Sequence, residues 1–214
     1  IMAYSSYFKV TTARFANVAF SNGSLLASFI ERLMKRQPLV APNDVKRYFV
    51  SPEESGQICM LASILGYNKE IFFPKLKKEQ MITFSSICDN FLKVLGYTKK
   101  ECINEDEARK YAAEMAEGSK VYPVFYFESD TTGEKMYEEF YIEGEKFNMN
   151  RFISLGVIEN VQKRSIKEIE ELLKELNTLF INPNYSKNDV VEVMKNFVDN
   201  FEHIEIGKNL DQKM

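Results

Sequence analysis

The sequence is poor in the residues that usually build metal centres and disulfide frameworks. Its 214 residues include no tryptophan, one histidine and three cysteines. Cys59, Cys88 and Cys102 are widely spaced and form no C-x-x-C pair, which argues against a disulfide framework and excludes an ordinary zinc site. The lone His203 has no serine or cysteine motif beside it that would make it a catalytic base. We therefore expect idle or buried thiols in a reducing cytosol, and no metal.

Long apolar runs and an excess of one charge sign are also missing. No stretch approaches the roughly 20 apolar residues that span a bilayer, and the first residues lack the basic flank and apolar run of a signal peptide. The 28 basic and 31 acidic side chains are interspersed and give a net charge of -3. A broad nucleic-acid surface is therefore not expected. The composition predicts a soluble, cytoplasmic protein with no membrane contact in this portion.

The nine glycines contain no G-x-G-x-x-G pattern. That pattern follows the first strand of a dinucleotide-binding fold, where it lets the backbone and a helix N-terminus approach a pyrophosphate. Its absence means that these residues do not encode the usual dinucleotide-binding turn.

The apolar pattern alternates between the two periods that are typical of strands and helices. Because strands alternate with helices, the pattern indicates an α/β fold with helical additions at its end. Pro123 suggests that the strand containing it lies at a sheet edge. Strands are predicted at residues 9–20, 47–50, 70–73 and 121–127, and helices at 24–37, 52–66, 83–95, 104–115, 165–180 and 186–201.

Three stretches carry most of the functional information. The first motif is Arg14-Phe-Ala-Asn-Val-Ala-Phe-Ser-Asn-Gly-Ser24, the second is Lys46-Arg-Tyr-Phe-Val50, and the third is Thr132-Gly-Glu-Lys-Met-Tyr-Glu-Glu-Phe140. By residue type alone, each also suits a plain structural role. The first can be a strand, a turn and a capped helix, the second a surface arginine, and the third a turn before an acidic helix.

In this order the motifs resemble the carboxyl-terminal half of the nucleotide-sugar 4,6-dehydratases. These are extended short-chain dehydrogenases of bacterial polysaccharide and nonulosonic-acid synthesis, with motifs R-F-x-N-V-x-x-S-x-G-S, M-T-R-Y-F-M-T-x-x-E-A and R-P-G-E-K-L-Y-E-E-L. The resemblance covers about the first 76 residues and residues 121–140. It departs from the family at Thr131 and Thr132, which replace the arginine and proline of the third motif.

The resemblance implies the carboxyl-terminal part of a Rossmann-like fold with a substrate lobe and appended helices. Residues 1–145 would form the end of the core plus the substrate-binding lobe, and residues 146–214 a helical appendage. No tyrosine is followed by a lysine four residues later, so the family's catalytic Tyr-x-x-x-Lys pair is missing. We therefore expect the catalytic residues upstream of Ile1, and we expect no catalysis by these residues alone.

Roles for individual residues follow from the matched positions. In the first motif, Asn17 would contact the substrate, with Asn22 and Ser24 bordering it, while Ala16 and Val18 would lie near the cofactor.

The other two motifs would hold the nucleotide. Arg47 would bind the pyrophosphate, because a planar guanidinium can donate to two phosphate oxygens at once. Glu134 would accept hydrogen bonds from ribose hydroxyls.

The implied reaction uses NAD or NADP and a UDP-N-acetylhexosamine. Oxidation at C4 acidifies the C5 proton, water leaves from C6, and the hydride returns there. The family is commonly oligomeric, so a homo-oligomer is also implied. Two alternatives stay open: a nucleotide-sugar epimerase, which uses the same C4 oxidation without loss of water, and a non-catalytic module that binds a sugar nucleotide or supports assembly.

Overall fold

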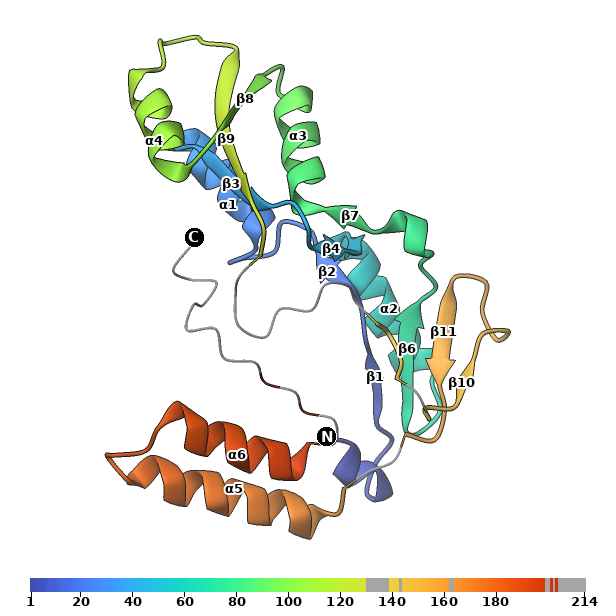
Figure 1. Ribbon diagram of the computed structural model, residues 1–214. Coiled ribbons are helices and arrows are strands. Elements are labelled where there is room, and N and C mark those ends of the chain that lie inside the picture. The colour runs from blue at the N-terminus through green and yellow to red at the C-terminus, as the bar shows by residue number, and fades with distance from the viewer. Residues whose placement is uncertain (130–138, 143, 162–163, 199–200, 202, 204–214) are drawn as a thin grey trace.

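The computed structural model describes residues 1–129, 139–142, 144–161, 164–198, 201 and 203, and it has a mixed α/β architecture (Figure 1). A four-stranded sheet lies at one end of the body and a three-stranded parallel sheet at the other. Two small two-stranded pairings lie between them. A helical hairpin stands beside the body (Figure 1). The α/β class agrees with the prediction.

The four-stranded sheet has the order β1-β6-β11-β10. Strand β1 runs parallel to β6, whereas β11 pairs antiparallel with both β6 and β10. Helix α2 packs Ile58 and Ala62 against Phe72 of β6 and Val157 of β11. The elements are the short 3₁₀ helix η1 (Met2–Ser6), β1 (Thr11–Ala13), α2 (Pro52–Leu65), β6 (Glu70–Pro74), β10 (Phe147–Asn148) and β11 (Leu155–Ile158).

The three-stranded sheet has the order β3-β9-β8, with all strands parallel. Its core contains Phe29 of α1, Leu39 of β3, Cys88 of α3 and Tyr122 of β9. These side chains are almost completely buried, so the sheet and its helices form one hydrophobic core. The elements are α1 (Leu25–Met34), β3 (Leu39–Pro42), α3 (Phe84–Val94), β8 (Thr98–Cys102), α4 (Glu105–Glu114) and β9 (Val121–Phe127).

Between the two sheets, β2 (Asn17–Val18) runs parallel to β5 (Phe49–Val50), and β4 (Lys46–Arg47) runs antiparallel to β7 (Ile82–Thr83). A 3₁₀ turn, η2 (Lys78–Gln80), precedes β7. These pairings place residues of the first two motifs side by side at the centre of the molecule (Figure 1).

The hairpin consists of α5 (Ile166–Ile181) and α6 (Lys187–Phe197). Each helix begins with a capping box, in which Ser165 or Ser186 accepts the N–H of the third helical residue and that residue's carboxylate accepts the serine N–H. Both helices begin where the sequence predicts. None of the helices in the described ranges is long and apolar enough to cross a membrane.

Strand β9 corrects the prediction for Pro123. This proline lies on the central strand of its sheet, not on an edge strand. The register explains why proline is tolerated there. Pairing with β3 begins at Val124, so at Pro123 strand β9 has a registered partner only on the β8 side, opposite Lys100.

The sequence analysis also missed the strands β3, β7, β8, β10 and β11. Two of these strands lie in residues 146–161, within the part assigned to a helical appendage, where β11 pairs with β6. Helix begins there only at Ile166. The two-part domain division itself stays a prediction.

An ion pair with a buried carboxylate joins β6 to the chain between β10 and β11. Glu70 is 5% exposed, and each of its carboxylate oxygens lies 2.8 Å from Nη1 of Arg151. The backbone N–H of Tyr67 donates to the same carboxylate at 2.7 Å, and the Arg151 guanidinium lies 4.4 Å from the Tyr67 ring centroid. Arg151 also donates to the carbonyl of Leu65, at the end of α2. The pair therefore ties β6, α2 and the β10–β11 connection together.

Candidate functional site

The fold brings the first two motifs and Phe140, the last residue of the third motif, together at one place. Asn17 of the first motif donates its N–H to the carbonyl of Tyr48 at 3.1 Å, and Ala19 donates to Val50 at 2.9 Å. The Tyr48 ring packs on Phe140 of the third motif, with 5.4 Å between ring centroids. Ala16, Tyr48 and Val50 form one buried cluster, and Phe140 packs against it. Segments separated by long stretches of sequence thus share a single small core.

Arg14, the first residue of the first motif, connects this core to the chain after the third motif. Its Nη1 and Nη2 donate to the two carboxylate oxygens of Glu145 at 2.8 and 2.7 Å, and Nη1 also donates to the carbonyl of Phe140 at 3.1 Å. Burial alone would raise the pKa of Glu145, but these bonds and the N–H of Ile142 lower it below its ordinary value. The pair is therefore charged on both sides and bidentate.

Asn17 lies on β2 beside the second motif. Its side-chain Nδ2 donates to the same Tyr48 carbonyl as its backbone, at 3.4 Å. Ala16 is 5% exposed, and its methyl group lies in the cluster with Tyr48 and Val50. The N–H groups of Asn17 and Ala19 point toward β5, so the N–H of Val18 points to the opposite edge of β2. Any contact of Ala16 or Val18 with a ligand would thus be made mainly by backbone groups at that edge.

Asn22 and Ser24 lie on the turn between β2 and α1. Asn22 is exposed, and Ser24 is the N-cap of α1, where its Oγ accepts the N–H of Ala27 at 3.2 Å. Capping uses one acceptor position of the hydroxyl and leaves its proton to be donated elsewhere. Their assignment to the sugar nucleotide stays a prediction.

Arg47 is half-buried on β4, directly before Tyr48, whose carbonyl accepts from Asn17. Its Nη1 donates to the carbonyl of Lys46 at 2.9 Å. Chain connectivity therefore places Arg47 next to the contact of the first two motifs. Glu134, like Thr131 and Thr132, lies outside the described residues, so its role in ribose binding stays a prediction.

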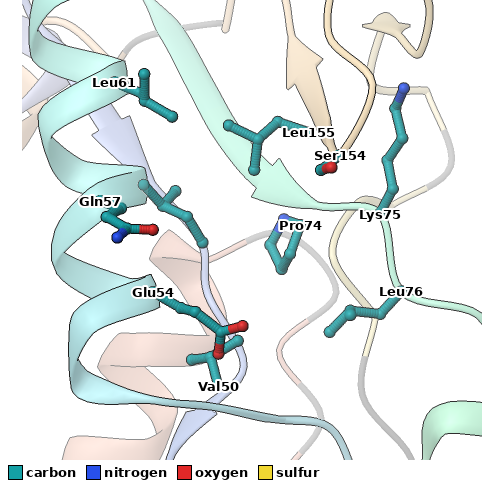
Figure 2. Close-up of a pocket in the computed structure, with 10 residues that line it drawn as sticks. Val50, Glu54, Gln57, Leu61, Pro74, Lys75, Leu76, Ser154 and Leu155 are labelled. Atoms are coloured by element: carbon teal, nitrogen blue, oxygen red, sulfur yellow. The ribbon is translucent and has the colours of Figure 1, made fainter.

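A pocket of ≈ 390 Å³ lies beside this core, at the carboxyl ends of β5 and β6 (Figure 2). Figure 2 shows Glu54 and Gln57 of α2 on one side and Pro74 and Leu76 on the other. The ammonium group of Lys75 points away from the pocket and donates to the carbonyls of Met149, Phe152 and Ile153. With mostly apolar walls and a carboxylate, the pocket suits an uncharged group better than a diphosphate.

A second pocket of ≈ 250 Å³ lies between the second and third motifs and shares Leu76 with the first pocket. Its lining includes Tyr48, Lys78, Glu139, Phe140 and Tyr141. Aromatic walls of this kind can receive a planar ring, here with one lysine and one carboxylate beside it. Both pockets therefore border the place where the motifs meet.

The turn before α1 contains one glycine, Gly23, whose φ of +75° is the left-handed conformation that favours glycine. A Cβ atom there would meet nothing within 4 Å, so the space beside this backbone is open. Among the residues that the structure describes, no group of three or more His, Cys, Asp or Glu side chains is arranged to hold a metal ion.

Asp44 and Glu145 are the polar residues that sequence reasoning missed. Asp44 accepts the N–H of Ser129, which lies 3.0 Å from each carboxylate oxygen. Asp44 comes shortly before the second motif, and Glu145 shortly after the third. Acidic residues that flank a motif were the available signal, but a single sequence does not pair them with partners 85 and 131 residues away.

Comparison with known proteins places the chain in a family. No curated protein matches it. Among solved structures, the X-ray structure of Pen from Bacillus thuringiensis is similar, with 18% sequence identity and a TM-score of 0.48, over 76% of this chain and 44% of that chain. The chain thus spans less than half the length of that protein. A family model described as polysaccharide biosynthesis protein matches residues 2–159. The chain therefore belongs to this family of polysaccharide biosynthesis proteins.

Proposed function

We propose that the chain is the substrate-binding portion of an NAD- or NADP-dependent UDP-N-acetylhexosamine 4,6-dehydratase of bacterial surface polysaccharide or nonulosonic-acid synthesis. The observation that carries the proposal is the meeting of the first two motifs with Phe140 of the third around Tyr48, where Val50 lines one pocket and Tyr48 lines another. Membership in the polysaccharide biosynthesis family supports the general role.

In this proposal the residues of the motifs bind and orient the substrate. Arg47 holds the diphosphate, Asn17 contacts the substrate beside it, and Glu134 binds the ribose. Asn22 and Ser24 border the sugar nucleotide at the start of α1. The larger pocket, with its apolar walls and without an inward-pointing ammonium group, accepts an uncharged part of the ligand.

The nicotinamide cofactor would accept and return the hydride, and groups outside the described residues would hold most of it. The edge of β2 at Ala16 and Val18 would border it through backbone groups. Because the 214 residues contain neither G-x-G-x-x-G nor Tyr-x-x-x-Lys, we expect them to bind the sugar nucleotide without converting it.

Isothermal titration calorimetry with UDP-N-acetylglucosamine tests the proposal directly. The unmodified chain should bind, and Arg47→Ala and Glu134→Ala should each weaken binding by about tenfold or more, which corresponds to roughly 1.4 kcal/mol. The matched control is Arg109→Ala, because Arg109 pairs with Glu105 on the surface of α4, away from the motifs. Binding that is absent from the folded chain, or unaffected by both substitutions, would contradict the proposal.

A further inference from the structure

The turn between β2 and α1 contains Ser21-Asn22-Gly23-Ser24, in which glycine directly follows asparagine. None of the other asparagines among the 214 residues precedes a glycine. The pair matters because the backbone nitrogen after an asparagine lies within reach of the carbonyl carbon of that asparagine's own side chain. Glycine adds no Cβ atom beside that nitrogen, so it leaves the approach open.

Hydrogen bonding in this turn uses neither of the two groups that would react. The N–H of Ser24 closes the turn on the carbonyl of Ser21 at 3.0 Å, and the N–H of Ser21 donates to the carbonyl of Val18 at 3.3 Å. Within the described part of the chain, neither the side-chain amide of Asn22 nor the N–H of Gly23 makes a hydrogen bond. No contact therefore has to break before the Gly23 nitrogen approaches the Asn22 side chain.

The space around the turn is open to water, while its two ends are fixed. Asn22 and Gly23 are exposed, and a Cβ atom at Gly23 would meet nothing within 4 Å. Before the turn, the N–H of Ala19 donates to the carbonyl of Val50 at 2.9 Å, and after it Ser24 is the N-cap of α1. A change at Asn22 would therefore act on a short connection between two fixed positions.

We propose that Asn22 is a site of spontaneous modification, at which the protein converts the asparagine to aspartate or isoaspartate. The Gly23 nitrogen loses its proton and bonds to Cγ of Asn22, the bond from Cγ to the amide nitrogen breaks, and ammonia leaves with that proton. Water then opens the resulting succinimide ring. Opening at Cγ gives aspartate, and opening at the backbone carbonyl carbon gives isoaspartate, in which the chain continues through the former side chain. The steps consume water and release ammonia, and they need no oxidant or reductant.

The products change the charge and the length of the first motif. Both carry a carboxylate in place of the neutral amide, two residues before the N-cap of α1. A negative charge near a helix N-terminus interacts favourably with the helix dipole, so α1 should persist. Isoaspartate also adds a carbon atom to the backbone between Ala19 and Ser24. The modification therefore alters a turn of the first motif without unfolding the helix that follows it.

Two other exposed asparagines serve as internal controls. Asn150 precedes Arg151 and Asn184 precedes Tyr185, and the N–H of each following residue donates a hydrogen bond of 3.2 Å. In both places the nitrogen that would attack therefore lies beside a side chain and is already bonded. These two asparagines should stay amides while Asn22 reacts.

Peptide mapping of the full chain tests the site. The protein is incubated in neutral buffer and digested at intervals, and liquid chromatography with mass spectrometry separates the asparagine, aspartate and isoaspartate forms of each peptide. Far-UV circular dichroism checks that the incubated samples stay folded. Conversion should be faster at Asn22 than at Asn150 and Asn184. It should be lost in Asn22→Gln, whose longer side chain would have to form a larger ring, and slowed in Gly23→Ala by the added Cβ atom. Equal rates at the three asparagines of the folded chain, or an Asn22 that stays an amide, would overturn the inference.

Calorimetry with UDP-N-acetylglucosamine tests the effect on the ligand, which rests on the function proposed above. Asn22→Asp reproduces the added charge and should weaken binding about twofold or more, as a like charge about 8 Å from a phosphate does in water. The control Asn184→Asp adds the same charge outside the motifs and should leave binding unchanged. Undiminished binding by Asn22→Asp would overturn the effect on the ligand. Conversion of Asn22 in a chain that does not bind would support the modification and count against the proposed function, whereas binding by a chain whose Asn22 does not convert would overturn the modification and leave the proposed function standing.

Discussion

Replacing Arg151 with methionine tests how far the buried ion pair stabilises the four-stranded sheet. Glu70 is 5% exposed. Both of its carboxylate oxygens accept hydrogen bonds from Arg151 at 2.8 Å, and one also accepts the N–H of Tyr67 at 2.7 Å. Methionine preserves much of the apolar length of arginine but removes the guanidinium. Arg151→Met would therefore leave a carboxylate buried without its charged partner.

The expected loss follows from what remains in the folded protein. Removing one partner of a buried ion pair costs about 3–5 kcal/mol, because the remaining charge stays desolvated. For a domain of this size, 1 kcal/mol shifts the melting temperature by about 2–4 °C, so the variant should melt roughly 6–20 °C lower. Adding Glu70→Gln should recover part of the loss, since the double variant buries no charge.

Urea unfolding followed by far-UV circular dichroism measures these differences. The control is Lys99→Met, since the Lys99 and Asp89 side chains are 38% and 40% exposed and their pair should contribute less than about 1 kcal/mol. A loss below about 1 kcal/mol for Arg151→Met would refute the reasoning. The reasoning would also be refuted if the double variant with Glu70→Gln were as unstable as Arg151→Met alone, because the unpaired charge would then not be the cause of the loss.

Three further predictions concern packing, thiol reactivity and pH. A Cβ atom at Gly156 would lie 2.5 and 2.8 Å from two ring carbons of buried Phe73, so Gly156→Ala should lower the free energy of unfolding by about 1–3 kcal/mol. Gly56 lies within α2 with open space beside it, so Gly56→Ala should raise the free energy of unfolding by about 0.5–1 kcal/mol. Urea unfolding of the two variants compares these effects. Burial raises the pKa of Cys88 to about 12, so a disulfide reagent should label exposed Cys59 in the native protein and Cys88 only after unfolding, and equal rates would contradict this. The pKa of Glu145 is lowered in the folded protein by its hydrogen bonds, although burial opposes this. Its contribution to stability should therefore be complete above the ordinary value of about 4.3 and be lost as the pH falls through the lowered pKa. The free energies of unfolding of the wild type and Glu145→Gln should accordingly converge in acid. If the two stabilities instead change in parallel with pH, the lowered pKa of Glu145 is not the cause.

Local signals predicted the helices well. Ser51, Pro52 and Glu54 indicated the start of α2, and the structure shows a complete capping box there, with Glu54 Oε2 accepting the Ser51 N–H at 2.7 Å and Ser51 Oγ accepting the Glu54 N–H at 3.1 Å. Gly66 ends the helix as predicted. Such signals lie within a few residues of the boundary that they define, so one sequence is enough to find them.

Pairing between distant segments could not be predicted in the same way. Strand β10 has two residues and β11 contains Gly156, so neither shows the alternation that indicates a strand. Strand β11 forms because β6 offers a partner more than 70 residues earlier in the chain, and β10 then pairs with β11. Pro123 was misplaced for the same reason, because its tolerance depends on where pairing with β3 begins.

In the candidate site, too, local features could be predicted from the sequence and contacts between distant segments could not. The motifs were found from local sequence, but their meeting depends on contacts such as Asn17 with Tyr48 and Tyr48 with Phe140. Resemblance named residues that could contact the ligand. It did not identify the partners of Arg14 and Asp44, because only the fold brings those partners near.

The contacts also narrow what each predicted site residue can offer a ligand. Asn17 donates its side-chain N–H to the Tyr48 carbonyl, and its amide oxygen is its one side-chain acceptor. Ser24 accepts from Ala27 and can still donate its hydroxyl proton. Ala16 offers only backbone, because its methyl group is buried. If the proposed function holds, Asn17→Leu should therefore weaken binding, since leucine keeps no acceptor there. Unchanged binding would mean that the ligand does not use that oxygen.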